Sequence, residues 1–278
     1  MNNFCIIVNK DRDEKLELTQ RVQECLLAQG KQFCIRTESV MQEEFVPVPE
    51  SVEGVIVLGG DGTMIRAANR LKERSIPMLG INAGNVGYLT GAEVNETEKS
   101  LECLCRDDFF VEDRMMLDVF FGDMYSDTVL NEVAITRSGV SRLIRVAVSV
   151  NGALLDVIVG DGLLISTPTG STGYNMSAGG AIVKPEAELI MITPLCPHSL
   201  SSRPVIVSAE DEITLTVMQD TRKQDARVMA TYDGREAMQL KEGDTLTIQR
   251  SAYTTKLIKL DERSFFEVLR TKLGKADR

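Results

Sequence analysis

The chain has 278 residues, of which 43% are hydrophobic and 26% are charged, and its formal net charge is -10. This balance is typical of a globular protein with a hydrophobic core, in one large domain or two modest ones. The acidic balance and the lack of a long basic run argue against a nucleic-acid binder, and no apolar stretch is long enough to span a bilayer, so we expect no membrane partner.

The cysteines and the histidine argue against a zinc-binding protein. Six cysteines are scattered among apolar neighbours without a zinc-binding spacing, which is typical of reduced, mostly buried thiols in a cytosolic protein. His198 is the single histidine of the sequence, so two-histidine metal motifs are excluded. The first apolar run follows no basic segment, and it predicts a strand rather than a signal peptide. We therefore expect a cytoplasmic protein.

Strands and helices alternate in the first third of the chain. Short apolar runs predict strands, and amphipathic segments between them predict helices. Gly30 is placed to end the first helix, and Asn95 with Glu98 forms a capping pair that should open the third. The alternation predicts parallel pairing, and therefore a doubly wound, mostly parallel α/β sheet. The predicted strands are 4–9, 32–36, 54–59 and 77–82, and the first two predicted helices are 13–29 and 63–72.

The pattern changes near residue 107. Alternating valines lead into Asn151-Gly152, which predicts a β-hairpin, and Asp233-Gly234 offers a second tight turn. Ser264 and Glu267 form a capping box before the last helix. We expect two closely joined domains with a cleft between them. The expected ranges are 1–106 for the α/β domain, 107–260 for a β-rich domain, and 261–278 for a helix that packs back on the first domain.

The strongest local pattern is the glycine-rich turn GGDGT at residues 59–63, between a buried strand and a helix. Ligands of parallel sheets bind beyond the carboxyl ends of the strands, and glycines let a phosphate approach the N–H groups of a helix start. An aspartate would repel phosphate, so Asp61 indicates a group that accepts a proton from an attacking hydroxyl or holds a metal ion. A tight Asp-Gly turn is the ordinary alternative, but it explains one glycine rather than three. The Walker and dinucleotide-binding fingerprints are both absent.

Five blocks, in order along the chain, resemble the bacterial NAD kinase family. The resemblance implies a two-domain fold, with a β-sandwich domain that binds the dinucleotide. It implies transfer of the γ-phosphate of ATP, or of polyphosphate, to the 2′-hydroxyl of the adenosine ribose of NAD, giving NADP. It also implies Mg2+ carried by the nucleotide rather than by a dedicated protein site, and assembly as a homodimer or homotetramer. The blocks are GGDGT at 59–63, GINAGNVGYL at 80–89, NEV at 131–133, DGLLISTPTGSTGYNMSAGG at 161–180 and ITPLCPHSLSSRP at 192–204.

The resemblance assigns the central roles to the loop and to the NEV block. Asp61 corresponds to the family's proton acceptor, and Gly60 and Gly62 belong to the loop beside the substrate. Asn131 and Glu132 correspond to the pair that fixes the dinucleotide. An amide can donate to and accept from a base edge, and a carboxylate can accept from two ribose hydroxyls. From the residues alone, a solvated strand end is the simpler interpretation of this pair.

The long block supplies the remaining dinucleotide contacts implied by the resemblance. Thr172, Gly173, Tyr174 and Ser177 belong to a stretch that resembles the family's adenine-binding segment. Most relatives have alanine in place of Gly173, so the pocket should be somewhat looser here. Asp161 matches a family carboxylate near the nicotinamide end, although a plain Asp-Gly turn explains it nearly as well on chemistry alone.

Two arginines and the histidine complete the expected site. Arg66 follows the loop by one helical turn and can reach back toward it, and Arg142 matches a family position that holds the dinucleotide phosphate. A guanidinium suits phosphate because it donates two parallel hydrogen bonds, although surface ion pairs are the ordinary alternative for both. His198 is expected to line the pocket near the dinucleotide, with a structural role as its alternative.

Two other functions fit part of the sequence. A lipid kinase with the same loop would need an acyl cavity and membrane attachment, and the sequence contains no amphipathic basic helix for the latter. A non-catalytic NAD or NADP sensor would not need an acidic residue in its phosphate loop. An assay of NADP formation separates these alternatives from an NAD kinase.

Overall fold

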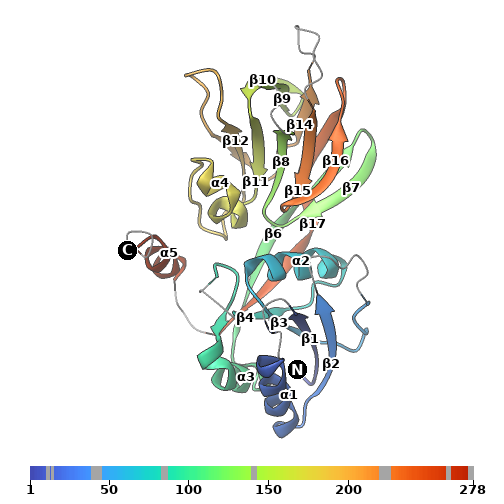
Figure 1. Ribbon diagram of the computed structural model, residues 1–278, viewed down its shortest axis with the longest axis vertical. Coiled ribbons are helices and arrows are strands. Elements are labelled where there is room, and N and C mark those ends of the chain that lie inside the picture. The colour runs from blue at the N-terminus through green and yellow to red at the C-terminus, as the bar shows by residue number, and fades with distance from the viewer. Residues whose placement is uncertain are drawn as a thin grey trace. The chain divides into compact units, whose positions relative to one another are not determined.

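The computed structural model of the protein describes residues 1–10, 13, 16–38, 46–82, 87–138, 143–218, 227–260 and 264–274 (Figure 1). The chain divides into two compact units. Unit 1 comprises residues 1–114 and 254–278, and unit 2 comprises residues 115–253. No helix in the described ranges has the length and hydropathy needed to cross a membrane.

Unit 1 is built on a parallel sheet. β1 (Asn3–Asn9) pairs in parallel with β2 (Gln32–Glu38) on one side and β3 (Gly54–Leu58) on the other. β3 pairs in parallel with β4 (Met78–Asn82). β3 and β4 are buried along their whole length, as expected of strands covered on both faces. The doubly wound parallel sheet predicted from the sequence is therefore confirmed.

Three helices connect or follow the strands of this sheet along the chain. α1 spans Glu17–Ala28, α2 spans Asp61–Leu71 and α3 spans Thr97–Cys105. α1 is amphipathic and ends, as predicted, just before Gly30, whose φ of 67° belongs to the left-handed region. The shorter elements of this unit are η1 (Lys72–Arg74), β5 (Ala92–Glu93) and η2 (Val94–Glu96).

The predicted cap of α3 is wrong. Asn95 lies inside the 3-10 turn η2, and α3 begins two residues later at Thr97 without a side-chain cap from Glu96. The Thr97 hydroxyl donates to the Val94 carbonyl at 2.7 Å. This bond joins the first residue of α3 to the preceding turn, but it caps no backbone N–H of the helix because the hydroxyl is the donor.

Unit 2 is antiparallel and β-rich. One sheet has the strand order β13-β12-β11-β8-β15-β16, and a second set of antiparallel strands runs β10-β9-β14-β17, with β6 and β7 paired to each other. Two left-handed turns, at Asn151-Gly152 and Asp233-Gly234, join β9 to β10 and β15 to β16 as predicted. The strands are β6 (Phe110–Phe121), β7 (Met124–Val129), β8 (Glu132–Arg137), β9 (Ile144–Val150), β10 (Ala153–Gly160), β11 (Gly162–Ser166), β12 (Leu189–Leu195), β13 (Val205–Ser208), β14 (Ile213–Val217), β15 (Val228–Tyr232), β16 (Arg235–Leu240) and β17 (Thr245–Lys259).

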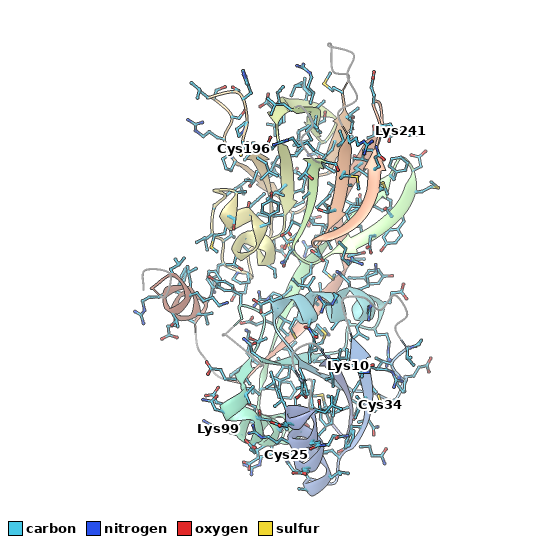
Figure 2. All side chains as sticks on the ribbon, viewed as in Figure 1. Lys10, Cys25, Cys34, Lys99, Cys196 and Lys241 are labelled. Atoms are coloured by element: carbon cyan, nitrogen blue, oxygen red, sulfur yellow. The ribbon has the colours of Figure 1, made fainter. Side chains whose placement is uncertain are left out.

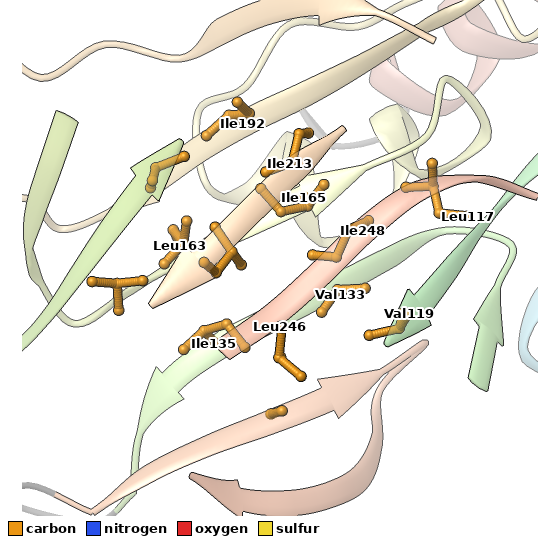
Figure 3. Packing of buried hydrophobic residues seen from close by; sticks show 14 of the residues in the cluster. Leu117, Val119, Val133, Ile135, Leu163, Ile165, Ile192, Ile213, Leu246 and Ile248 are labelled. Carbon is orange, nitrogen blue, oxygen red and sulfur yellow. The ribbon is translucent and has the colours of Figure 1, made fainter. Parts of the chain in front are cut away.

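The core of unit 2 lies between its two sets of strands. Alternate residues of β9, β14 and β15 are buried, so each strand turns one face inward. Figure 3 shows Val133 and Ile165 from one sheet among Ile213 and Ile248 from the other set of strands. This packing is that of a β-sandwich, which confirms the second half of the predicted fold.

Two strands carry the chain between the units. β6 and β17 each contribute residues to both, and Leu257 of β17 pairs in parallel with Met78 of β4 inside unit 1. The last helix, α5 (Phe265–Gly274), begins with the predicted capping box. Ser264 N donates to Glu267 Oε2 at 2.8 Å, and Glu267 N donates to Ser264 Oγ at 3.3 Å.

Candidate functional site

The glycine-rich loop joins β3 directly to α2. Gly60 is the residue before the helix, with φ -98° and ψ -170°, and its carbonyl accepts from Thr63 N at 2.9 Å and Met64 N at 3.1 Å. A Cβ on Gly60 would meet no described atom within 4 Å, and one on Gly62 would approach only Arg66 Nη1, at 3.6 Å. Packing within the described chain therefore does not require these two glycines, whereas an approaching phosphate would use the open space.

The Asp61 carboxylate is held by backbone donors. Tyr88 N donates to Oδ2 at 2.8 Å, and Leu89 N donates to Oδ1 at 3.0 Å. Gly87 lies so close that a Cβ there would overlap Asp61 Oδ1 and come within 2.8 Å of Thr90 Oγ1. The GYL turn of the second sequence block thus fixes the orientation of Asp61 through its backbone.

Thr63 connects the loop to neighbouring polar groups. Its hydroxyl accepts from Asn9 Nδ2 at 3.0 Å, and Arg66 Nη2 lies at 3.5 Å from the same oxygen. Arg66 therefore reaches back toward the loop, as the sequence suggested. At Tyr88, Lys272 Nζ of α5 lies 4.6 Å from the centre of the aromatic ring.

In unit 2, Asp233 organises the segment that precedes β8. Its Oδ1 accepts from Asn131 N at 2.7 Å and Glu132 N at 3.1 Å, and its Oδ2 accepts from Leu130 N at 2.9 Å. In return, Asp233 N donates to the Glu132 carbonyl at 3.0 Å. One carboxylate thus satisfies three consecutive backbone donors.

Several buried oxygens of this region have no hydrogen-bond partner among the described residues. Buried acceptors and hydroxyls rarely lack a hydrogen-bond partner, and a binding site for a polar ligand explains such atoms. Glu132 is 7% exposed, so its orphan oxygen is not simply turned to solvent. The atoms are Asn131 Oδ1, Glu132 Oε2, Ser166 Oγ and Thr169 Oγ1.

The environment of Glu132 favours its neutral form. Burial, followed by the negative charge of Asp233, raises the pKa of Glu132 to about 7, against the lowering effect of the Tyr174 backbone N–H. A ligand that donates hydrogen bonds to this carboxylate would stabilise the charged form and replace the lost solvation.

The predicted adenine segment forms two short helical turns, η3 (Thr169–Thr172) and α4 (Tyr174–Ser177). Asn175 is fully buried and fixes them: its Oδ1 accepts from Thr193 Oγ1 at 2.6 Å, and its Nδ2 donates to the Ala181 carbonyl at 3.0 Å. A Cβ on Gly173 would lie 3.3 Å from both Asn131 Nδ2 and Glu132 Oε2. This segment therefore lies directly against the NEV block.

A pocket of about 480 Å³ adjoins this segment within unit 2. An ion pair lies in its wall, with Arg137 Nε 2.6 Å from Asp161 Oδ1, and about a third of each of these side chains is exposed. Cys196, labelled in Figure 2, is the exposed thiol of the wall. The lining residues are Thr136, Arg137, Asp161, Tyr174, Ser177, Ala178, Leu195 and Cys196.

The remaining expected residues are placed as follows. Thr172 Oγ1 donates within its own turn to the Thr169 carbonyl at 3.3 Å. His198 is exposed, its backbone N–H donates to the Val159 carbonyl at 2.8 Å, and it is absent from the described lining of the pocket. Arg142 lies outside the described residues.

The cysteines only partly follow expectation. All six lie in the described ranges and are free thiols, but Cys5 and Cys105 alone are buried. Over those same ranges, no three His, Cys, Asp or Glu side chains gather as a metal site would require.

Sequence reasoning missed Asp233, Arg137 and Thr169 as parts of the candidate site, and it missed the backbone of Tyr88 and Leu89. The sequence predicts only a tight turn at Asp233. Its signal was its place at a tight turn, where a carboxylate can bond neighbouring backbone donors. The backbone donors of Tyr88 and Leu89 have no signature in side-chain chemistry.

Comparison with protein families assigns both halves of the chain. The profile of the ATP-NAD kinase N-terminal domain matches residues 42–109, and that of the ATP-NAD kinase C-terminal domain matches residues 130–260.

Similar proteins cover the chain almost completely. An NAD kinase of Lachnoclostridium phytofermentans is 42% identical over 99% of this chain and 99% of its own length. An NAD kinase of Lachnospira eligens is 38% identical over 98% of this chain and 100% of its own length.

Two solved structures share the fold. An NAD kinase from Archaeoglobus fulgidus in complex with ATP has a TM-score of 0.76 and 28% identity, over 97% of this chain and 98% of its own. Yeast NADH kinase complexed with NADH has a TM-score of 0.83 over 98% of this chain and 88% of its own, but only 20% identity, so it shows the fold alone.

Proposed function

The chain belongs to the NAD kinase family, whose members phosphorylate NAD to NADP with ATP, and we propose that Asp61 is its catalytic carboxylate and Asn131 and Glu132 its main contacts to NAD. The relatives described above are all nicotinamide-dinucleotide kinases, and nothing favours the lipid kinase or the sensor.

The observation that carries the proposed substrate contacts is the pair of orphan oxygens in the NEV block. Asn131 Oδ1 and Glu132 Oε2 are buried acceptors without a donor in the described chain. Adenosine offers matching donors, because its ribose hydroxyls and its amino group all carry hydrogens. Ribose hydroxyls donating to Glu132 would stabilise its ionised form despite burial.

Asp61 is suited to accept the proton of the attacking hydroxyl. Each of its oxygens accepts one backbone N–H, from Tyr88 or Leu89, so the carboxylate is oriented while lone pairs remain on both oxygens. Such general-base assistance contributes roughly 10²- to 10⁴-fold in rate. Positioning and charge neutralisation supply much of the rest in phosphoryl transfer.

The donor phosphates are proposed to lie at the start of α2, over Gly60. The open space beside this glycine and the partial positive charge of the helix start suit an anion. Arg66 adds a positive charge one turn further on. When bound, Mg2+ supplies neutralisation of the triphosphate charge. Each Asp61 oxygen accepts one N–H bond and keeps lone pairs, so this carboxylate would be the group of the loop able to contact a metal carried by the nucleotide.

The rest of the dinucleotide is proposed to contact the segment of η3 and α4. Thr172, Gly173, Tyr174 and Ser177 would hold the adenine, with the Thr169 hydroxyl as a further partner. Asp161 would meet the nicotinamide end. Contacts of Arg142 and His198, a cytoplasmic location and assembly into a homodimer or homotetramer remain proposals from the family resemblance.

The test is formation of NADP by the purified protein. The assay supplies NAD or NADH with ATP or polyphosphate, in the presence of Mg2+ or of a chelator. We expect NADP from NAD and ATP only with the metal, and an unchanged melting temperature of the nucleotide-free protein after chelation. Absence of NADP under every condition would rule out the proposed function, and a chelator-induced loss of stability would place the metal in the protein instead.

A further inference from the structure

We propose that Asp233 is a positioning residue for NAD, which fixes the backbone of residues 130–132 and places a negative charge beside Glu132. The inference rests on the proposed function, because it takes Glu132 to be the carboxylate that accepts from the ribose. Asp233 itself is not proposed to touch the substrate.

The first part of the argument is geometric. The backbone N–H groups of Leu130, Asn131 and Glu132 all donate to the Asp233 carboxylate, at 2.7 to 3.1 Å. The reciprocal bond from Asp233 N to the Glu132 carbonyl closes the arrangement at 3.0 Å. Because these three backbone N–H groups donate to Asp233, they are not available to Asn131 Oδ1 and Glu132 Oε2. Both of these oxygens have no hydrogen-bond partner among the described residues.

The second part concerns charge. Asp233 is the charged group that faces Glu132 from the turn between β15 and β16. β11 places the uncharged Ser166 opposite Glu132, and α4 contributes only the Tyr174 backbone N–H. Burial and the Asp233 charge together raise the pKa of Glu132 to about 7. The charge of Asp233, together with burial, therefore favours proton uptake by Glu132.

The local backbone allows a clean substitution. Asp233 has a φ of 49°, in the left-handed region, and Gly234 follows with 75°. Asparagine adopts this conformation readily, so Asp233→Asn keeps the turn. It removes the charge and one of the acceptor oxygens, because an amide nitrogen cannot accept a hydrogen bond.

The experiment measures NAD affinity by calorimetry and the NAD dependence of turnover, on both sides of pH 7, for the wild type and for D233N, D233S, D233E and E132Q. The wild type should lose NAD affinity as the pH falls through about 7, because protonated Glu132 accepts poorly from ribose hydroxyls. D233N and D233S should weaken NAD binding by about 5- to 10-fold at high pH, the effect of a lost hydrogen bond. Both should also shift the acidic loss of affinity to lower pH. D233E should keep the inflection near that of the wild type.

The matched control is D211N. Asp211 is another turn carboxylate of unit 2, which accepts from Ser208 N at 2.8 Å and Asn151 Nδ2 at 2.7 Å. D211N should leave both NAD affinity and its pH dependence unchanged. A purely structural Asp233 would weaken affinity without moving the inflection, and that result, or an unchanged affinity in D233N and D233S, overturns the inference. An inflection that persists in E132Q overturns the assignment of Glu132 as well. Failure of the wild type to form NADP instead rejects the proposed function.

Discussion

The side chain of Asp61 rests against the α-carbon of Gly87, so closely that a β-carbon at position 87 would overlap its Oδ1. The two residues belong to different sequence blocks, one at the start of α2 and one in the turn after β4. The glycine of the GYL turn is therefore part of the support of the proposed catalytic carboxylate, although it carries no side chain of its own.

We predict that Gly87→Ala disables turnover. The added methyl group must displace Asp61 from the backbone donors of Tyr88 and Leu89, and a small misplacement of a catalytic group lowers the rate by roughly 100-fold. The measurement is kcat for NADP formation. Gly274→Ala in α5 is the control, because its methyl group would meet no described atom within 4 Å. Normal turnover of G87A would show that the orientation of Asp61 is not important.

Asp61→Asn should lower kcat by about 10²- to 10⁴-fold, because an amide cannot accept the proton of the ribose hydroxyl. Asp13→Asn is a matched control: Asp13 also accepts two backbone N–H groups at a helix start, from Leu18 at 3.3 Å and Thr19 at 2.9 Å. The control should lose stability but retain kcat. Turnover of D61N within a few-fold of the wild type would remove Asp61 from the role of base.

The two glycines before α2 should respond differently to alanine. In Gly60→Ala the methyl group enters open space and the backbone angles suit alanine, so stability should be unchanged while the KM for ATP rises. In Gly59→Ala the Cβ would lie 2.5 Å from Thr63 Oγ1, and overpacking of this kind costs about 1–3 kcal/mol of stability. Thermal unfolding and steady-state kinetics distinguish the two effects. Equal ATP kinetics in G60A and the wild type would place the donor elsewhere.

Glu132 should make the stability of the ligand-free protein depend on pH. Its folded-state pKa of about 7 lies above the ordinary value of 4.5, so the folded protein binds this proton more tightly than the unfolded chain. Its contribution is fully present below pH 4.5 and is lost as the pH rises to about 7, by an amount on the order of 3 kcal/mol. Urea denaturation of the wild type and of Glu132→Gln should diverge over this range. Parallel curves would contradict the raised pKa.

Arg137→Met should affect binding more than stability. Its pair with Asp161 is about a third exposed, and such pairs contribute less than about 1 kcal/mol. Released from its partner, Asp161 should bind the dinucleotide less well, and we expect the KM for NAD to rise several-fold. Arg250→Met is the control, because Arg250 is equally exposed and pairs with Glu188 and Glu210 at 2.8 Å. If both variants changed the KM for NAD equally, the Arg137–Asp161 pair would have no specific role in the pocket.

Much of the fold could be predicted because its signals are local. The buried strand, the glycines and the helix of the 55–68 segment follow one another directly, and Asn151-Gly152 dictates its own hairpin. The start of α3 was misjudged because Asn95 has the chemistry of a cap but lies within a 3-10 turn. A propensity for capping does not by itself say which turn of the chain becomes helical.

The support of the site could not be predicted, because it depends on strand pairing between distant segments. Asp233 reaches residues 130–132 only because β15 pairs with β8, which aligns Tyr232 with Val133. Likewise, Tyr88 and Leu89 act through backbone N–H groups, which every non-proline residue possesses. The sequence singles out Asp61 and Glu132 by the chemistry of their side chains, but it does not predict the groups that hold them.

The course of β17 has a consequence for synthesis of the protein on the ribosome. Unit 1 contains Asp61, but its core also includes Ile258, which is 1% exposed and packs with the strands of the parallel sheet. The α/β unit therefore cannot complete its sheet until the residues of unit 2 have been synthesised, because β17 follows them in the chain. We expect incomplete nascent chains to be more sensitive to proteolysis than the full-length protein until residues beyond 258 have left the exit tunnel.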